Sequence, residues 1–116
     1  MIRTLLATAA LAIGVVSATG ASAFERWVNI YNQANATLVD VRISHIDTRE
    51  WGPNILYATI PSGGVNWVEP VYNDGYCRFD IYLGYADGTE STIMDVNLCE
   101  ALDLYTDGYT YEIRTI

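Results

Sequence analysis

The chain contains no lysine, a single histidine and no apolar run long enough to cross a membrane. Its basic side chains are six arginines, which face fourteen aspartates and glutamates. Nucleic acids and anionic lipids bind clusters of Lys and Arg, so both are poor partners for this protein. The carboxylates are scattered rather than grouped in blocks, which favours a role in solubility, while cations or a basic protein surface remain suitable partners.

The N-terminus has the pattern of an export signal. Arg3 supplies a positive charge, residues 5–16 are apolar or small, and Ala21-Ser22-Ala23 is a small-x-small cleavage site. A membrane anchor is the weaker alternative, because a spanning helix needs roughly 20 apolar residues. Cleavage after Ala23 removes one positive charge and takes the formal net charge from −8 to −9. We therefore expect a signal peptide at 1–23 and one periplasmic or secreted domain at 24–116.

The exported part is rich in strand-forming residues and has no sustained helical repeat. Tyr, Trp, Val, Ile and Thr stand between clusters of Gly, Asn and Asp. The predicted strands are 26–32, 39–45, 65–69, 77–85, 90–98, 102–105 and 109–116. The first two are expected to form a hairpin around a turn at 32–36. Such short strands, with turns about every ten residues, predict a small antiparallel β-sandwich of immunoglobulin-like architecture.

The clearest alternation lies on either side of Asp87-Gly88, which is a strong hairpin turn. The side chains expected to face inward are Phe79, Ile81, Leu83 and Tyr85 before the turn and Met94, Val96 and Leu98 after it. Folding this hairpin, with one small bulge, brings Cys99 beside Cys77. In an oxidising compartment these two cysteines are expected to form a disulfide worth about 3 kcal/mol. The alternatives are a metal site or a catalytic thiol, and one distant histidine suits neither.

His45 is the first candidate for a functional side chain. It continues the inward face of a predicted strand with Val39, Val41 and Ile43. Asp47 and Glu50 follow, and the three side chains together offer ligands for a cation. The favoured interpretation is a histidine hydrogen-bonded at the edge of the core. His45 is also the one imidazole available as a general base, and no Ser-His-Asp or Cys-His arrangement is visible around it.

Trp51 stands in the one irregular stretch, residues 46–57, where Trp51-Gly52-Pro53-Asn54 interrupts any strand. Loops held by a rigid scaffold often display binding residues, so Trp51, Asn54 and His45 are the candidate binding residues. The alternative is that Trp51 fixes the loop to the sandwich. A single helical turn is possible at 54–56.

Turn carboxylates provide a candidate site for calcium. Asp74, Asp87 and Asp107 lie in turns and offer the hard oxygen ligands that calcium prefers. None follows the spacing of a dedicated calcium loop, and Asp before Gly is foremost a turn sequence. Turns are therefore favoured over calcium. A site made from two turns at one end of the sandwich would not be visible in the sequence.

Several motifs resemble a loose family of small, uncharacterised exported proteins of proteobacteria. The matching segments are WGPNIL at 51–56, IPSG at 60–63, CRFDI at 77–81, DGTE at 87–90 and VNLCE at 96–100. The resemblance covers residues 51–100, about half of the exported part. It implies a β-sandwich with this cysteine pair and brings no catalytic residues. Residues 103–116 depart from the pattern by adding a hairpin where the family has a single closing strand.

The sequence thus supports one main functional hypothesis, an exported and non-enzymatic domain that binds a protein or a small ligand near Trp51. The second is a calcium-stabilised structural or sensing module that uses the turn carboxylates. The third, a small hydrolase with His45 as base, is the weakest, because no partner residues converge on that histidine.

Overall fold

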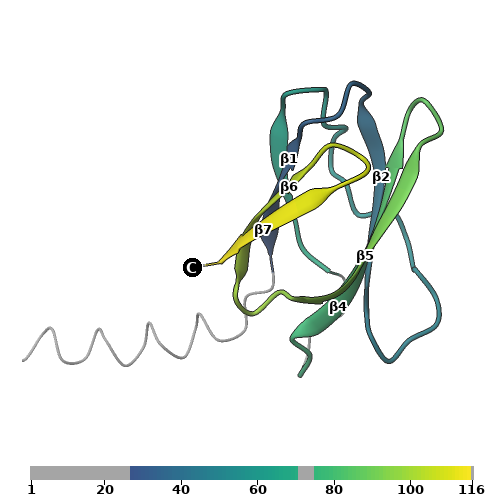
Figure 1. Ribbon diagram of the computed structural model, residues 1–116. Helices are drawn as coiled ribbons and strands as arrows, with labels where there is room; N and C mark the ends of the chain where they lie inside the picture. Colours follow the sequence, from purple (N-terminus) through teal and green to yellow (C-terminus); the bar gives the residue numbers. More distant parts are fainter. Residues whose placement is uncertain (1–26, 71–74, 116) are drawn as a thin grey trace, which may run out of the picture.

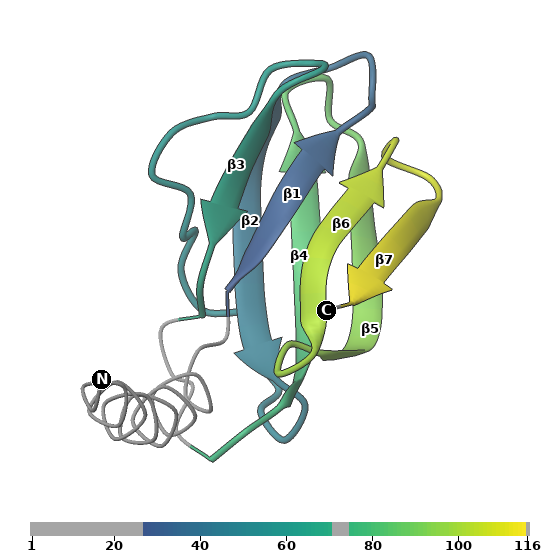
Figure 2. The ribbon, with the colours of Figure 1, turned by 90° about the vertical axis from the view of Figure 1, so that its left-hand side faces the viewer.

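The computed structural model describes residues 27–70 and 75–115, and within these ranges the chain forms seven strands and no helix. The strands are β1 (Val28–Asn32), β2 (Leu38–His45), β3 (Val65–Val68), β4 (Arg78–Tyr85), β5 (Glu90–Asn97), β6 (Ala101–Thr106) and β7 (Tyr111–Thr115). They make a four-stranded sheet in the order β3-β1-β6-β7 and a three-stranded sheet in the order β2-β4-β5. The two sheets lie face to face, which confirms the predicted β-sandwich (Figures 1 and 2).

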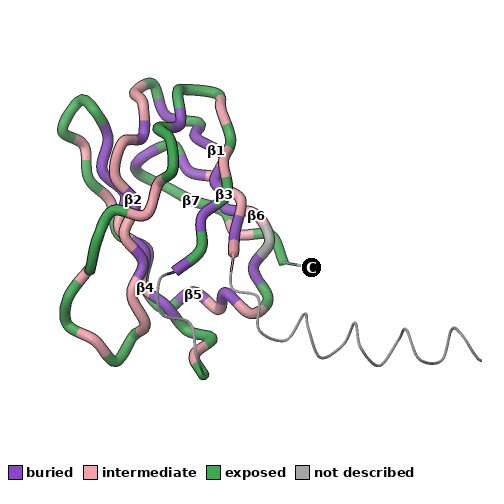
Figure 3. Tube along the Cα trace, turned by 180° about the vertical axis from the view of Figure 1, so that it is seen from behind, coloured by how far each residue is buried: buried purple, intermediate pink, exposed green. Residues whose placement is uncertain are grey.

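The hydrophobic core lies between the two sheets, where buried segments of both layers face each other (Figure 3). Its largest fully buried apolar side chains are Val28, Ile30, Leu38, Val41, Ile60, Val68, Phe79, Ile81, Leu83, Leu98 and Leu104. Each such side chain contributes about 1.5–3 kcal/mol relative to exposure. Strand pairing is mostly antiparallel, and the exception is the parallel pair of β1 and β6.

The hairpin expected from the first two strands is wrong. β1 pairs with β3 and β6, whereas β2 pairs with β4 in the other sheet. Residues 33–37 therefore cross from one sheet to the other. The physical reason is burial, because an arch between the sheets lets the apolar side chains of both strands face each other across the core. The sequence pattern of an arch, two strands joined by a polar turn, is the same as that of a hairpin.

The inward face of β2 also differs in part from the prediction. Val41 and Ile43 are buried as expected, but the pairing register shifts between Leu38 and Asp40. As a result Leu38 is fully buried, whereas Val39 is only partly buried.

The hairpin of β4 and β5 forms as predicted, with Phe79 paired to Val96 and the Leu98 N–H donating to the Cys77 carbonyl at 2.8 Å. The disulfide Cys77–Cys99 is present. The expected bulge lies at Asp95, which has a φ of 58°.

This bulge corrects one prediction about the buried face of β5. It inserts an extra residue, so Ile93 is buried in place of Met94, whose side chain is 58% exposed. The final hairpin, β6 and β7 around Asp107-Gly108, also forms as expected.

The predicted signal segment 1–23 lies outside the described residues. Among the residues that are described, none belongs to a helix long and apolar enough to span a membrane.

Candidate functional site

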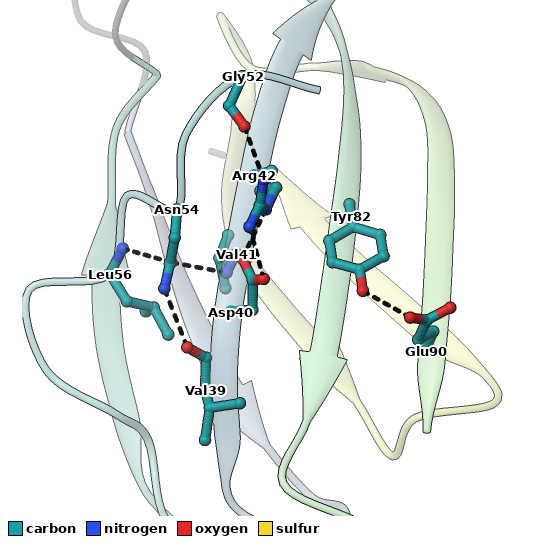
Figure 4. Close-up of polar contacts among 9 residues, drawn as sticks. All are labelled: Val39, Asp40, Val41, Arg42, Gly52, Asn54, Leu56, Tyr82 and Glu90. Carbon is teal, nitrogen blue, oxygen red and sulfur yellow. Dashed lines mark hydrogen bonds and ion pairs between the residues drawn. The ribbon is translucent and has the colours of Figure 1, made fainter. Parts of the chain in front are cut away.

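The loop that carries Trp51, residues 46–57, runs along the free edge of β2 and is attached to it by Asn54. The Asn54 side-chain oxygen accepts the Val41 and Leu56 N–H groups at 3.0 and 3.1 Å, and its nitrogen donates to the Val39 carbonyl at 3.0 Å (Figure 4). The Ile55 N–H donates to the Val41 carbonyl at 2.8 Å. The helical turn suggested at 54–56 is therefore wrong, because this segment lies extended and follows β2.

Arg42 provides a second attachment between the loop and the sheet. Its guanidinium forms a two-pronged ion pair with Asp40 at 2.9 and 3.0 Å and donates to the Gly52 carbonyl at 3.1 Å (Figure 4). The hydrogen bond with Asp40 raises the pKa of Arg42 above its usual value. The loop that displays Trp51 is thus fixed at three points, Gly52, Asn54 and Ile55.

Trp51 itself is partly buried against the sheet. Its ring packs at a tilt on Tyr82 of β4, with the ring centroids 5.8 Å apart. The Tyr82 hydroxyl donates to the Glu90 carboxylate at 2.9 Å, and this bond raises the pKa of Tyr82 (Figure 4). Trp51 therefore has a structural contact with Tyr82 and is only partly buried.

Trp51 also lines a cavity of about 180 Å³, which we call the Trp51 cavity. It is lined by Ile43, Ser44, His45, Thr48, Glu50, Trp51, Gly52 and Pro53. The structure therefore brings together two of the three predicted binding residues, His45 and Trp51. Asn54 does not line the cavity, and both ends of its amide are engaged with the backbone of β2 and the loop.

His45 lies at the end of β2, partly buried, with its ring stacked on Tyr76 at a centroid distance of 3.9 Å. Its Nδ1 accepts the Asp47 N–H at 3.3 Å. No hydroxyl hydrogen-bonds this imidazole within the described part of the chain, and both cysteines are in the disulfide. The surroundings of His45 are those of a packing and lining residue.

The cation site considered at His45, Asp47 and Glu50 does not form in the described structure. Residues 27–70 and 75–115 contain no cluster of three or more His, Cys, Asp or Glu side chains with the geometry to hold a metal ion.

A larger cavity, about 350 Å³, lies at the opposite end of β2, and we call it the hairpin-end cavity. It is lined by Gln33, Ala34, Asn35, Ala36, Tyr85, Asp87, Thr89, Asp107, Gly108 and Tyr109. The β1–β2 crossover and the tips of the β4–β5 and β6–β7 hairpins meet at this end (Figures 1 and 2). Two predicted calcium candidates, Asp87 and Asp107, thus share one cavity, whereas Asp74 lies outside the described residues.

Both carboxylates of the hairpin-end cavity accept hydrogen bonds from their own turns. The Thr89 N–H donates to Asp87 at 2.9 Å. The Thr110 and Tyr109 N–H groups donate to Asp107 at 2.7 and 2.9 Å, and the Thr110 hydroxyl adds a bond at 3.1 Å. These backbone bonds lower the pKa of both aspartates, so both are ionised at neutral pH.

Tyr85 is the residue of this cavity whose role the sequence did not indicate. It was predicted only as an inward-facing core residue, and it is indeed just 4% exposed. Its hydroxyl is buried away from solvent. Burial raises the pKa of Tyr85, a side-chain hydrogen bond with Thr106 opposes the rise, and the charges of Asp107 and Asp87 add to it. A buried hydroxyl has no sequence signature, because Tyr and Phe are interchangeable in an alternating pattern.

Comparison with known proteins yields a likeness of fold and nothing about activity. No family model matches the chain, and no curated protein matches it. A protein from Eubacterium rectale with an NMR structure has a similar fold, with a TM-score of 0.50 and 11% sequence identity. The match covers 79% of this chain and 88% of the other.

Proposed function

We propose that the protein is an exported, non-enzymatic binding domain whose Trp51 cavity receives an apolar side chain of a partner protein. The observation that carries this proposal is that His45, from the end of a strand, and Trp51, from a loop, line one cavity. Arg42 and Asn54 hold the loop in place before any partner arrives, so little conformational entropy is lost on binding.

The dimensions of the cavity favour a side chain over a free ligand. Cavities that hold drug-sized molecules measure about 300–1,000 Å³, and the Trp51 cavity measures about 180 Å³. Trp is also enriched among the residues that dominate protein interfaces, where it sits in or around a pocket that excludes water. A protruding apolar residue of a protein partner is therefore the occupant that fits best.

Export is supported by the disulfide and by the N-terminal pattern. Disulfides persist in oxidising compartments, and Cys77–Cys99 is formed in this domain. The periplasm or the extracellular space is thus the proposed location, in keeping with the resemblance to small exported proteins.

A peptide selection tests the site. Peptides that bind the exported protein would be isolated from a random displayed library, and their affinities measured against Trp51→Ala and His45→Ala. We expect Trp51→Ala to weaken binding at least tenfold, as for a residue at the centre of an interface. Tyr111→Ala is the matched control, because Tyr111 is an aromatic residue that is 53% exposed on β7 of the other sheet. Affinities that fall equally in the Trp51 and Tyr111 variants, or in neither, would contradict the proposal.

The melting temperature of the Trp51→Ala variant separates binding from stability. Asn54 and Arg42 still hold the loop in this variant, so we expect the domain to remain folded with a loss of about 1 kcal/mol from the contact with Tyr82. Unfolding of the variant at room temperature would show that Trp51 is required to fix the loop, and the His45→Ala affinity would then be the test of the site.

A further inference from the structure

We infer that β7 is a dimerisation edge, where it pairs antiparallel with β7 of a second copy of this chain around a twofold axis at Ile113. The free side of this strand and the placement of its charges point to the contact. The contact involves neither cavity, so it is independent of the function proposed for the Trp51 cavity.

β7 lies at the end of the four-stranded sheet, and within the described part of the chain no strand pairs with its outer side (Figure 2). An edge strand offers a row of backbone N–H and C=O groups to another strand. The other edge strands are less suited to such pairing. β2 is bonded to the loop at 46–57, β5 is interrupted by the bulge at Asp95, and β3 has only four residues and no charge.

The outward face of β7 carries one negative and one positive side chain, Glu112 and Arg114, while Ile113 between them packs against the core. The Glu112 and Arg114 side chains are 64% and 58% exposed and form an ion pair at 3.3 Å. Arg114 also lies over the ring of Tyr105 on β6, 4.5 Å from its centroid. Two opposite charges are thus held on the same face of the sheet edge, two residues apart.

Antiparallel pairing about Ile113 matches these charges. This register sets Ile113 opposite itself and Glu112 opposite Arg114 of the second copy, and symmetry makes the charge pair occur twice. Opposite charges directly across a strand pair are favourable, whereas like charges are unfavourable. A slip of two residues in either direction would set Glu112 opposite Glu112, or Arg114 opposite Arg114. The charges therefore select one twofold register, and the partner that fits it is a second copy.

The size of the contact sets the expected affinity. β7 is five residues long, whereas a standard protein interface uses about 20–30 residues on each side. We therefore expect a weak dimer, with a dissociation constant of about 10–500 μM.

Sedimentation equilibrium of the exported protein with its disulfide intact tests for the dimer. The protein would be measured from about 10 μM to about 1 mM at physiological ionic strength, where repulsion between the acidic domains is screened beyond about 8 Å. Amide chemical shifts over the same range locate the contact, and we expect changes in β7 centred on Ile113. A monomer at every concentration, or shifts confined to another edge strand, would overturn the inference.

Charge reversal tests the register. Glu112→Arg and Arg114→Glu each set like charges opposite one another, so each variant alone should associate at least fivefold more weakly than the wild type. An equimolar mixture of the two restores opposite charges at both positions, with the same total charge as two wild-type copies, and should recover the wild-type affinity. Both positions are exposed, so we expect both variants to stay folded, which their amide spectra check.

Asp47→Arg is the matched control, because it changes the net charge as Glu112→Arg does, at an exposed position outside the strands. We expect it to associate at least as tightly as the wild type. Association that is unchanged in both single variants, or a mixture that associates no better than either variant alone, would overturn the inference.

Discussion

Asn32 and Asn54 make the same number of side-chain hydrogen bonds, and the difference in their burial predicts very different effects of removing them. Asn32 is 1% exposed. Its nitrogen donates to the carbonyls of Ala36 at 2.9 Å and Ile60 at 2.8 Å, and its oxygen accepts the Ala34 N–H at 3.0 Å. These three bonds fix the crossover between the sheets, which also forms one wall of the hairpin-end cavity.

The Asn32→Ala substitution leaves two carbonyls and one N–H without partners, mostly away from water. Each buried group costs about 1–3 kcal/mol when it is left unsatisfied, although partial relaxation reduces the total, so we expect a loss of about 3–5 kcal/mol. Asn54→Ala also breaks three bonds, but Asn54 is exposed and water can replace it. That substitution is expected to cost about 1 kcal/mol.

Urea unfolding of the two variants and the wild type measures the difference. The midpoint is expected to fall much further for Asn32→Ala than for Asn54→Ala, with an unchanged slope because the surface exposed on unfolding is the same. A domain of this size has about 5–13 kcal/mol of stability in total, so the Asn32 variant should remain folded but clearly weakened. Equal losses in the two variants would refute the reasoning that burial of the freed groups sets the cost.

Two further predictions concern the disulfide and the acid limb of stability. Replacing Cys77 and Cys99 by Ser opens a loop with a sequence separation of 22, and the chain-entropy model then predicts a loss of about 3 kcal/mol, measured by urea unfolding; a loss below about 1 kcal/mol would contradict it. For Asp107, bonds from Thr110 and Tyr109 hold the pKa below its unfolded value, so its contribution is complete above about pH 4 and is lost as the pH falls through the folded pKa. The stability difference between wild type and Asp107→Asn should therefore shrink as the pH falls from about 4 to about 2, and a constant difference would show that the carboxylate charge contributes nothing.

Local patterns predicted the parts of the fold in which sequence neighbours are also neighbours in space. The β4–β5 hairpin is such a case, because alternation, Asp87-Gly88 and the need to join Cys77 with Cys99 all specify the same register. The pairing of β1 with β6 is not such a case. It joins residues more than 70 positions apart, and no local turn encodes it. The sequence predicts a bulge in this hairpin but not its position at Asp95. The prediction that Met94 faces the core is therefore wrong.

The candidate sites also divide into features that the local sequence encodes and features that depend on how distant segments pack. Trp51 was recognised because an aromatic residue beside Gly and Pro interrupts a strand pattern, and the loop does place it beside a cavity. Asn54 is predicted as a binding residue, but its amide hydrogen-bonds to the Val41 N–H and the Val39 carbonyl on the edge strand β2, in the place where a neighbouring strand would pair. Asp87 and Asp107 were recognised as turn residues, yet their meeting at one cavity depends on how the two sheets are stacked, which the spacing of turns does not determine.

The two cavities lie at opposite ends of β2, and this separation allows peptide binding at the Trp51 cavity to be tested apart from substitutions at the hairpin end. Eight residues of extended strand span about 26 Å, which is far beyond the range over which substitutions usually influence each other. The chemistry of the two cavities also differs, because one presents Trp51 and the other two ionised carboxylates. Asp87→Asn, at the hairpin end, should therefore leave peptide binding at the Trp51 cavity unchanged. If Asp87→Asn impaired peptide binding as much as Trp51→Ala does, a change in the stability of the whole sandwich would explain the losses better than a contact at the Trp51 cavity.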